Sequence, residues 1–270
     1  MNKKIRTAFW GILVLILTTF SACKDKAGGG GINFFSLEDD KTFGAQVAGE
    51  IDADPATYPV LDSAQYPEAY TYLYAIRDSI LNSGKVVHKD DFSWRLRIIN
   101  DDSTLNAFCT PGGYIYVYTG IIKYLDSEDQ FAGVLGHEIA HADERHSTAA
   151  LTQQYGIDVL FSVLLGENKG ALAQVTQGLL GLKYGRGNES ESDMRSVEYL
   201  YPTAYDGRGA ARFFEKISDS GGSSGPEFLS THPNPDNRVE AIIAHWESLG
   251  GKVGQTFVGR YEQFQNSLPK

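Results

Sequence analysis

The stretch His137-Glu138-Ile139-Ala140-His141 decides both the fold and the chemistry expected of this chain. Residues four apart on an α-helix lie one turn apart on the same face, so two imidazoles at this spacing can bind a single ion. The glutamate beside the first histidine can then face a water molecule on that ion. The spacing therefore predicts a catalytic metal site built on a helix.

The flanking residues predict that helix. Ser127 with Gln130 three residues later matches a capping box, and the acidic Glu128 and Asp129 favour the first turn. Apolar residues then recur at helical spacing, and no proline interrupts the pattern before about residue 151. The recurring residues are Phe131, Val134, Leu135, Ile139 and Ala142.

A catalytic zinc site normally takes three protein ligands, so a third has to be found. A third histidine six residues after His141 is excluded, because Ser147 occupies that position, and Glu144 replaces the glycine of that pattern. His146 points roughly 140° away from His141 on a continuous helix. We therefore expect His146 to be a surface residue or a residue behind the ligands.

The acidic run from Asn188 to Asp193 opens a second helical segment and offers the missing ligand. Glu189 and Asp193 are four apart and share a face, which suits one carboxylate on the metal and the other holding a ligating histidine. A solvated acidic helix start would look the same, but the histidine motif favours the ligand interpretation. Two imidazoles and one carboxylate suit zinc, and we predict one Zn²⁺ per chain.

The histidine motif followed some fifty residues later by Glu189-x-x-x-Asp193 resembles the gluzincin metallopeptidases of the HtpX and CAAX prenyl endopeptidase group, and within it the BepA- and LoiP-like bacterial envelope lipoprotein peptidases. Further motifs match in the same order, and the resemblance spans about residues 40–245. These motifs are Asn106-Ala107-Phe108, Thr110-Pro111-Gly112-Gly113-Tyr114-Ile115-Tyr116-Val117, Ala204-Tyr205-Asp206, and Thr231-His232-Pro233 followed by Arg238. The departures are Cys109, Thr203 and Gly207, which stand where the family has a small residue, a glycine and a proline.

The resemblance implies an α+β, mainly helical, zincin-like metallopeptidase domain with a small β-sheet whose edge strand lines the active-site cleft. The segment from Gly113 to Tyr118 alternates as a strand and is expected to be that edge, where an extended substrate pairs by backbone hydrogen bonds. Gly112 and Gly113 would allow the substrate backbone to approach closely. The predicted substrate-binding residues are Asn106, Gly112, Gly113, Tyr114 and Ile115.

Three further site residues have predicted roles. Glu138 is expected to be the general base of peptide hydrolysis. By resemblance, His232 can occupy the open zinc position and inhibit the enzyme at rest, although an ordinary loop histidine after the Ser220–Gly225 stretch fits the sequence equally well. Arg238 is expected to stabilise either that loop or the oxyanion that develops on the substrate.

The first residues look like an export signal. Lys3, Lys4 and Arg6 precede an apolar stretch too short for a comfortable membrane span, and the stretch ends in a lipobox-like sequence at Cys23. We predict a lipoprotein signal peptide at 1–22, a lipid-anchored flexible tether at 23–40 beginning at the lipidated Cys23, and a zinc metallopeptidase domain at 41–270. An uncleaved transmembrane anchor is the competing interpretation.

Composition agrees with one exported domain. The net charge is −10, and residues 1–22 carry three positive and no negative charges, so the rest of the chain carries −13. This acidic balance argues against nucleic acid as a partner. With Cys23 acylated, Cys109 is the only cysteine left and no internal disulfide can form. Cys109 is expected to be a small buried residue and not a nucleophile.

The apolar runs 159–165 and 171–182 are each too short to span a membrane. We expect them to pack between helices or to cover the cleft. Other helices are expected near 39–51, 67–82, 209–218 and 234–249, with strands near 94–100 and 113–118.

The sequence as a whole predicts a zinc endopeptidase anchored in the bacterial cell envelope, on the periplasmic side or the cell surface, which removes unfolded, misfolded or misassembled proteins. The alternative is a chaperone-like or scaffold lipoprotein that binds extended polypeptide with little proteolysis. Glu138 argues against this alternative, because a structural metal site needs no general base. Nothing in the sequence indicates an oligomeric state.

Overall fold

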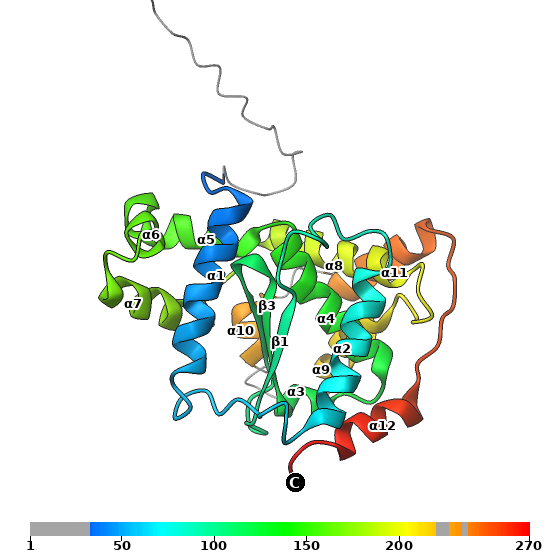
Figure 1. Cartoon of the computed structure of the whole chain (residues 1–270). Helices are drawn as coiled ribbons and strands as arrows, with labels where there is room; N and C mark the ends of the chain where they lie inside the picture. The colour runs from blue at the N-terminus through cyan, green and yellow to red at the C-terminus, as the bar shows by residue number, and fades with distance from the viewer. Residues whose placement is uncertain (1–32, 220–226, 234–236) are drawn as a thin grey trace, which may run out of the picture.

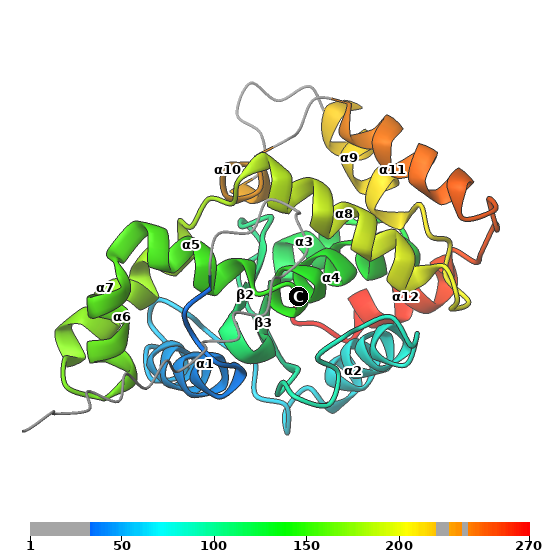
Figure 2. The same cartoon turned by 90° about the horizontal axis from the view of Figure 1, so that it is seen from above.

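The computed structural model describes residues 33–219, 227–233 and 237–270. The predicted signal peptide, Cys23, Pro235 and the Ser220–Gly225 stretch lie outside these residues. A small sheet lies between α1 on one side and α2, α4, α8 and α9 on the other (Figures 1 and 2). The helices are α1 Leu37–Asp52, α2 Pro67–Leu81, α3 Thr119–Tyr124, α4 Glu128–Asp143, α5 His146–Tyr155, α6 Ile157–Leu164, α7 Lys169–Leu180, α8 Arg186–Leu200, α9 Gly209–Asp219, α10 Glu227–Thr231, α11 Arg238–Ser248 and α12 Val258–Asn266.

The sheet has the strands β1 Arg95–Ile99, β2 Ala107–Thr110 and β3 Tyr114–Tyr118, in the order β1-β3-β2. β3 pairs with β1 in parallel and with β2 in antiparallel register. The mainly helical fold with a small sheet is confirmed, but the prediction that the Gly113–Tyr118 strand forms the edge was wrong. The chain turns back through a 3₁₀ turn at Pro111–Gly113, so β3 is hydrogen-bonded on both sides, and β2 is the edge strand beside α4.

Side chains of β3 alternate between two apolar clusters, as the strand period requires. Ile115 and Val117 belong to the main core, which contains the metal helix α4, whereas Tyr116 belongs to a second cluster formed with α1. Tyr116 stacks on Phe108 of β2, with ring centroids 5.0 Å apart. The sheet is therefore packed on both faces.

Gly112 and Gly113 have φ angles of 73° and 81°, which favour glycine. A Cβ on Gly112 would lie 2.9 Å from the carbonyl oxygen of Asp40 in α1, and a Cβ on Gly113 would lie 3.0 Å from the Trp94 ring. These glycines therefore allow a close approach of the protein's own backbone and core. The close approach of a substrate backbone, which we had expected at these positions, remains a prediction.

The metal helix α4 is buried along its whole length, from Glu128 to Asp143. The predicted capping box is absent, because the Ser127 hydroxyl donates to Asp129 and makes no bond to a backbone amide of the first turn. Instead, the carbonyl oxygen of Thr256 accepts hydrogen bonds from the amides of Glu128 at 3.0 Å and Asp129 at 3.4 Å. The segment before α12 therefore satisfies amides that α4 cannot satisfy itself.

The predicted helix to about residue 151 is broken in two. Arg145 has φ 60° and ψ 30°, a left-handed conformation, and separates α4 from α5. The Arg145 guanidinium forms an ion pair with Asp40 of α1, at 2.5 Å. This long-range contact stabilises the turn at which the helix changes direction.

α1 begins at Leu37, where Ser36 and Asp39 form a capping box. Asp40 is buried and accepts a hydrogen bond from the Thr148 hydroxyl at 2.8 Å. Burial raises the pKa of Asp40, and Arg145 partly opposes that effect. The folded domain thus includes residues 37–40, which we had predicted to be part of the tether.

The apolar runs 159–165 and 171–182 form α6 and α7, which pack against α1 in the second cluster. Packing between helices, which we expected, is confirmed. No helix among the described residues is long and apolar enough to cross a membrane.

Candidate metal centre

His137 and His141 lie one turn apart on α4, with their Nε2 atoms 3.0 Å from each other. Both side chains are fully buried. Burial lowers the pKa of His141 well below its usual value, so its imidazole stays neutral and its lone pair remains free to bind a metal.

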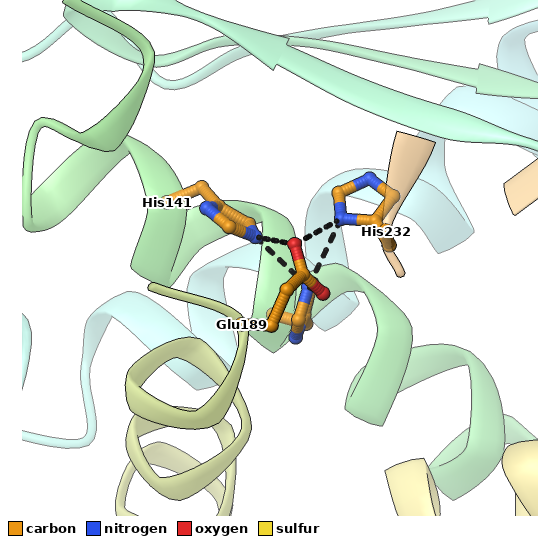
Figure 3. A group of neighbouring side chains, drawn as sticks. His141, Glu189 and His232 are labelled. Atoms are coloured by element: carbon orange, nitrogen blue, oxygen red, sulfur yellow. Dashed lines mark hydrogen bonds and ion pairs between the residues drawn. The ribbon is translucent and has the colours of Figure 1, made fainter. Parts of the chain in front are cut away.

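Glu189 enters from α8 and His232 from the end of α10, and their side chains point toward that of His141 (Figure 3). The Glu189 carboxylate lies 3.5 Å from His137 Nε2 and 3.3 Å from His141 Nε2. His232 Nδ1 lies 3.1 Å from Glu189 Oε1 and 3.3 Å from His137 Nε2. Ligand atoms of all four residues lie within 4.8 Å of one another.

These distances fit a tetrahedral ion. Bonds of 2.0–2.1 Å to four ligands place neighbouring ligand atoms about 3.3 Å apart. The separations given above run from 3.0 Å to 3.5 Å, all ligand atoms lie within 4.8 Å of one another, and all four side chains are buried. Three imidazoles and a carboxylate are a donor set that suits zinc.

Glu138 lies beside this group. Neither of its carboxylate oxygens has a hydrogen-bond partner among the described residues, although the side chain is fully buried. Its nearest charged neighbour is His232, whose Nε2 lies 3.4 Å from Oε1. Burial raises the pKa of Glu138 to about 7, with Glu189 adding to the effect and His232 opposing it. A buried carboxylate without a partner is suited to exchanging a proton with a reactant.

Asp193 and Arg238 lie behind the ligands. Asp193 is one turn after Glu189 on α8, and its Oδ1 lies 2.9 Å from His137 Nδ1. Arg238 donates to both oxygens of Asp193, at 2.6 Å and 2.7 Å, and to Glu189 Oε2 at 3.1 Å. The guanidinium thus compensates two buried carboxylates, and the carboxylate of Asp193 orients the His137 ring.

His146 lies behind the ligands, which is one of the two positions that we expected for it, whereas sequence reasoning missed Tyr184. Because the helix breaks at Arg145, His146 folds back, is 2% exposed, and places its Nδ1 3.1 Å from Nδ1 of His141. The Tyr184 ring stacks on His141 with centroids 3.9 Å apart, and its hydroxyl hydrogen-bonds to Ser147 at 2.8 Å. The turn at Arg145 depends on α1, so no local signal could have revealed the His146 contact, and no motif marks Tyr184.

The predicted substrate-binding residues lie mostly inside the fold. Asn106 is buried, and its side-chain oxygen accepts a hydrogen bond from the amide of Ala107. Ile115 is fully buried in the core, and Tyr114 is half-buried with its hydroxyl bonded to Ser93. The backbone edge near the site therefore belongs to β2.

Comparison with known proteins agrees with this geometry. The model of peptidase family M48 matches residues 67–245. The chain is similar to the mitochondrial metalloendopeptidase OMA1 of Arabidopsis thaliana, with 32% identity over 178 residues, which cover 62% of this chain and 36% of that protein. It is also similar to the beta-barrel assembly-enhancing protease of Escherichia coli (strain K12), with 32% identity over 157 residues, which cover 53% of this chain and 32% of that protein. The matches thus span about a third of the length of these relatives.

Proposed function

Because the chain belongs to peptidase family M48, we propose that it is a zinc-dependent endopeptidase that hydrolyses peptide bonds in unfolded or misassembled proteins of the bacterial cell envelope. The observation that carries the proposal is the buried group of His137, His141 and Glu189 with the Glu138 carboxylate beside it, whose oxygens accept no hydrogen bond from the described residues. A purely structural metal site would have no use for such a carboxylate.

In this mechanism His137, His141 and Glu189 would hold the ion. When bound, zinc supplies a Lewis acid for the substrate carbonyl and lowers the pKa of a bound water molecule. Glu138 would accept a proton from the attacking water and deliver it to the leaving amine. Asp193 keeps the proton of His137 on Nδ1, so that Nε2 faces the ion.

The substrate would pair with the edge strand β2, which presents its outer backbone beside α4. Recognition by backbone hydrogen bonds favours extended chains, and therefore unfolded protein, over a particular sequence. The amide of Phe228 in α10 already bonds to the carbonyl of Leu105, just before β2. α10 thus contacts the chain at the start of the edge that a substrate would need.

His232 follows directly after α10, and we propose that it inhibits the enzyme at rest as a fourth ligand. Its Nδ1 lies among the other ligand atoms and its Nε2 faces Glu138. If a substrate displaced α10, the same movement would remove His232 from the metal centre and expose the edge of β2. Four closed ligands also suit a structural site, and this favours a second candidate function, a chaperone-like protein that binds extended polypeptide with little cleavage.

The envelope location is proposed from the signal-like residues 1–22 and from Cys23, which would carry a lipid anchor. One relative is named a beta-barrel assembly-enhancing protease, which is consistent with substrates in the envelope.

Casein cleavage by the purified, zinc-loaded chain tests the activity. We expect cleavage that a chelator abolishes and that Glu138→Gln lowers by at least 10²-fold while zinc content is unchanged. His232→Ala should raise the basal rate severalfold. If wild type and His232→Ala both bind unfolded casein, contain zinc and cleave nothing, the peptidase proposal is wrong and the binding protein takes its place.

A further inference from the structure

Three large apolar side chains are exposed at α6 and on the segment at which the described residues begin. Phe34 is 60% exposed, Phe161 38% and Leu165 67%. Phe161 and Leu165 are four residues apart, at α6 and its C-cap, and so share one face. The Phe161 ring contacts that of Phe35, next to Phe34, with centroids 4.9 Å apart. We call Phe34, Phe161 and Leu165 the apolar rim.

The opposite face of α6 explains why the helix itself is stable. Leu160 and Val163 are buried in the cluster with α1 and α7. The carbonyl of Leu164 accepts a hydrogen bond from Gln46 of α1 at 3.3 Å. α6 therefore packs beside α1, as Figures 1 and 2 show, and Phe161 and Leu165 remain exposed on its other face.

The rim lies close to the proposed anchor. The ten Cα–Cα steps from Cys23 to Asn33 can span at most about 35 Å. A compact domain of this size has a radius of gyration of about 17 Å and a diameter on the order of 45 Å. A chain attached to the membrane at Cys23 cannot reach around the domain, so the face around Phe34 stays near the lipid surface.

We propose that the apolar rim docks into the surface of the phospholipid bilayer and fixes the orientation of the domain on the membrane. This inference rests on the lipid anchor included in the proposed function. Side chains such as phenylalanine and leucine on one helix face insert at the boundary between headgroups and acyl chains. The lipid anchor attaches the chain to the membrane, and the apolar rim determines which face of the domain is turned to the lipid.

The charges near the rim define the lipid it prefers. Asp158 on α6 and Glu167 just after it are exposed, as is Lys169 at the start of α7, so the local balance is one negative charge. The chain after residue 22 carries a net charge of −13, so anionic headgroups repel it. Docking should therefore be stronger on zwitterionic than on anionic lipid, the reverse of a basic amphipathic helix.

Val253 provides a matched control. It is 67% exposed, as is Leu165, but it lies in the connection between α11 and α12, on the opposite side of the molecule from α6 (Figures 1 and 2). Leu165→Cys and Val253→Cys can each carry an environment-sensitive fluorophore. Cys109 is fully buried and should not react. Intact mass would reveal a second label on Cys23 in a chain that is not acylated.

The full chain, purified from the membranes of an expressing bacterium, is reconstituted into phosphatidylethanolamine–phosphatidylcholine vesicles with a nitroxide quencher at headgroup depth. We expect the label at 165 to be quenched at least threefold more strongly than the label at 253. Adding phosphatidylglycerol should reduce the difference.

The outcomes separate the two proposals. If the chains float with the vesicles but both labels are quenched equally, the lipid anchor is supported and docking of the rim is refuted. Chains that do not float refute both. If the fluorescence of the label at position 165 changes with protein concentration in detergent and does not respond to lipid, a second copy of the chain covers the rim. That result also refutes docking to the bilayer.

Discussion

Replacement of Arg238 tests whether the site depends on a buried cation. The Asp193 and Glu189 carboxylates are at most 1% exposed, and Arg238 makes hydrogen bonds to both. Removing one partner of a buried ion pair costs about 3–5 kcal/mol, because a desolvated charge is left without compensation. Arg238→Met keeps an unbranched apolar side chain and removes the charge, including the cation–π contact in which the guanidinium lies 3.8 Å from the Phe214 ring centroid.

We therefore expect Arg238→Met to lower the free energy of unfolding by about 3–5 kcal/mol in the presence of a chelator. In a domain of this size that corresponds to a fall in Tm of roughly 6–20 °C. The loss should be smaller in excess zinc, because a bound cation compensates Glu189. Urea unfolding followed by circular dichroism, with and without zinc, measures both quantities.

Two variants control this experiment. Lys41→Met breaks the exposed ion pair with Glu38 and should leave the unfolding midpoint unchanged within error. Asp193→Asn combined with Arg238→Met removes both charges of one pair, so part of the loss should be recovered. If Arg238→Met in chelator unfolds within about 1 kcal/mol of wild type, the buried carboxylates do not depend on this arginine and the reasoning fails.

Three further predictions address the surroundings of the site. Gly112→Ala should lower the free energy of unfolding by at least about 1–2 kcal/mol in urea titration, because φ is 73° and a Cβ would contact α1; an unchanged midpoint would contradict this. His146→Leu removes the partner of His141 Nδ1 and should weaken zinc binding about 10- to 100-fold in competition with a chelating dye, whereas unchanged affinity would make the contact incidental. Burial alone would raise the pKa of Asp206, but hydrogen bonds from two arginines outweigh burial and hold that pKa at about 2. Asp206→Asn should therefore reduce stability at pH 7, and its difference from wild type should shrink as the pH falls from about 4 to about 2; a difference that stays constant over this range would rule out the carboxylate as its source.

The metal ligands could be predicted because their signal is local. His137 with His141, and Glu189 with Asp193, are each related by one helical turn, which the sequence spacing defines directly. The two pairs meet because α4 and α8 pack together, and the resemblance to a known family supplied that information.

The parts that were predicted wrongly depend on distant contacts. β3 is central because β1, which precedes it in the chain, pairs along its other side, and the alternation of residues 114–118 is the same in an edge and a central strand. The helix break at Arg145 requires Asp40 of α1. The break also brings His146 into contact with His141, whereas on a continuous helix the two side chains would point about 140° apart.

The cap that Thr256 provides to α4 links the metal helix to the last part of the chain. The amides of Glu128 and Asp129 and the carboxylate of Glu128 are satisfied from residues 256 and 260, which follow every proposed ligand in sequence. During synthesis the ligands therefore all leave the ribosome before the helix that carries two of them has its full set of partners. A chain truncated before Thr256 would keep every proposed ligand and yet lack the acceptor of these two amides and the Arg260 partner of Glu128. The stability of the helix that carries two of the proposed ligands thus depends on residues that are synthesised after all of them.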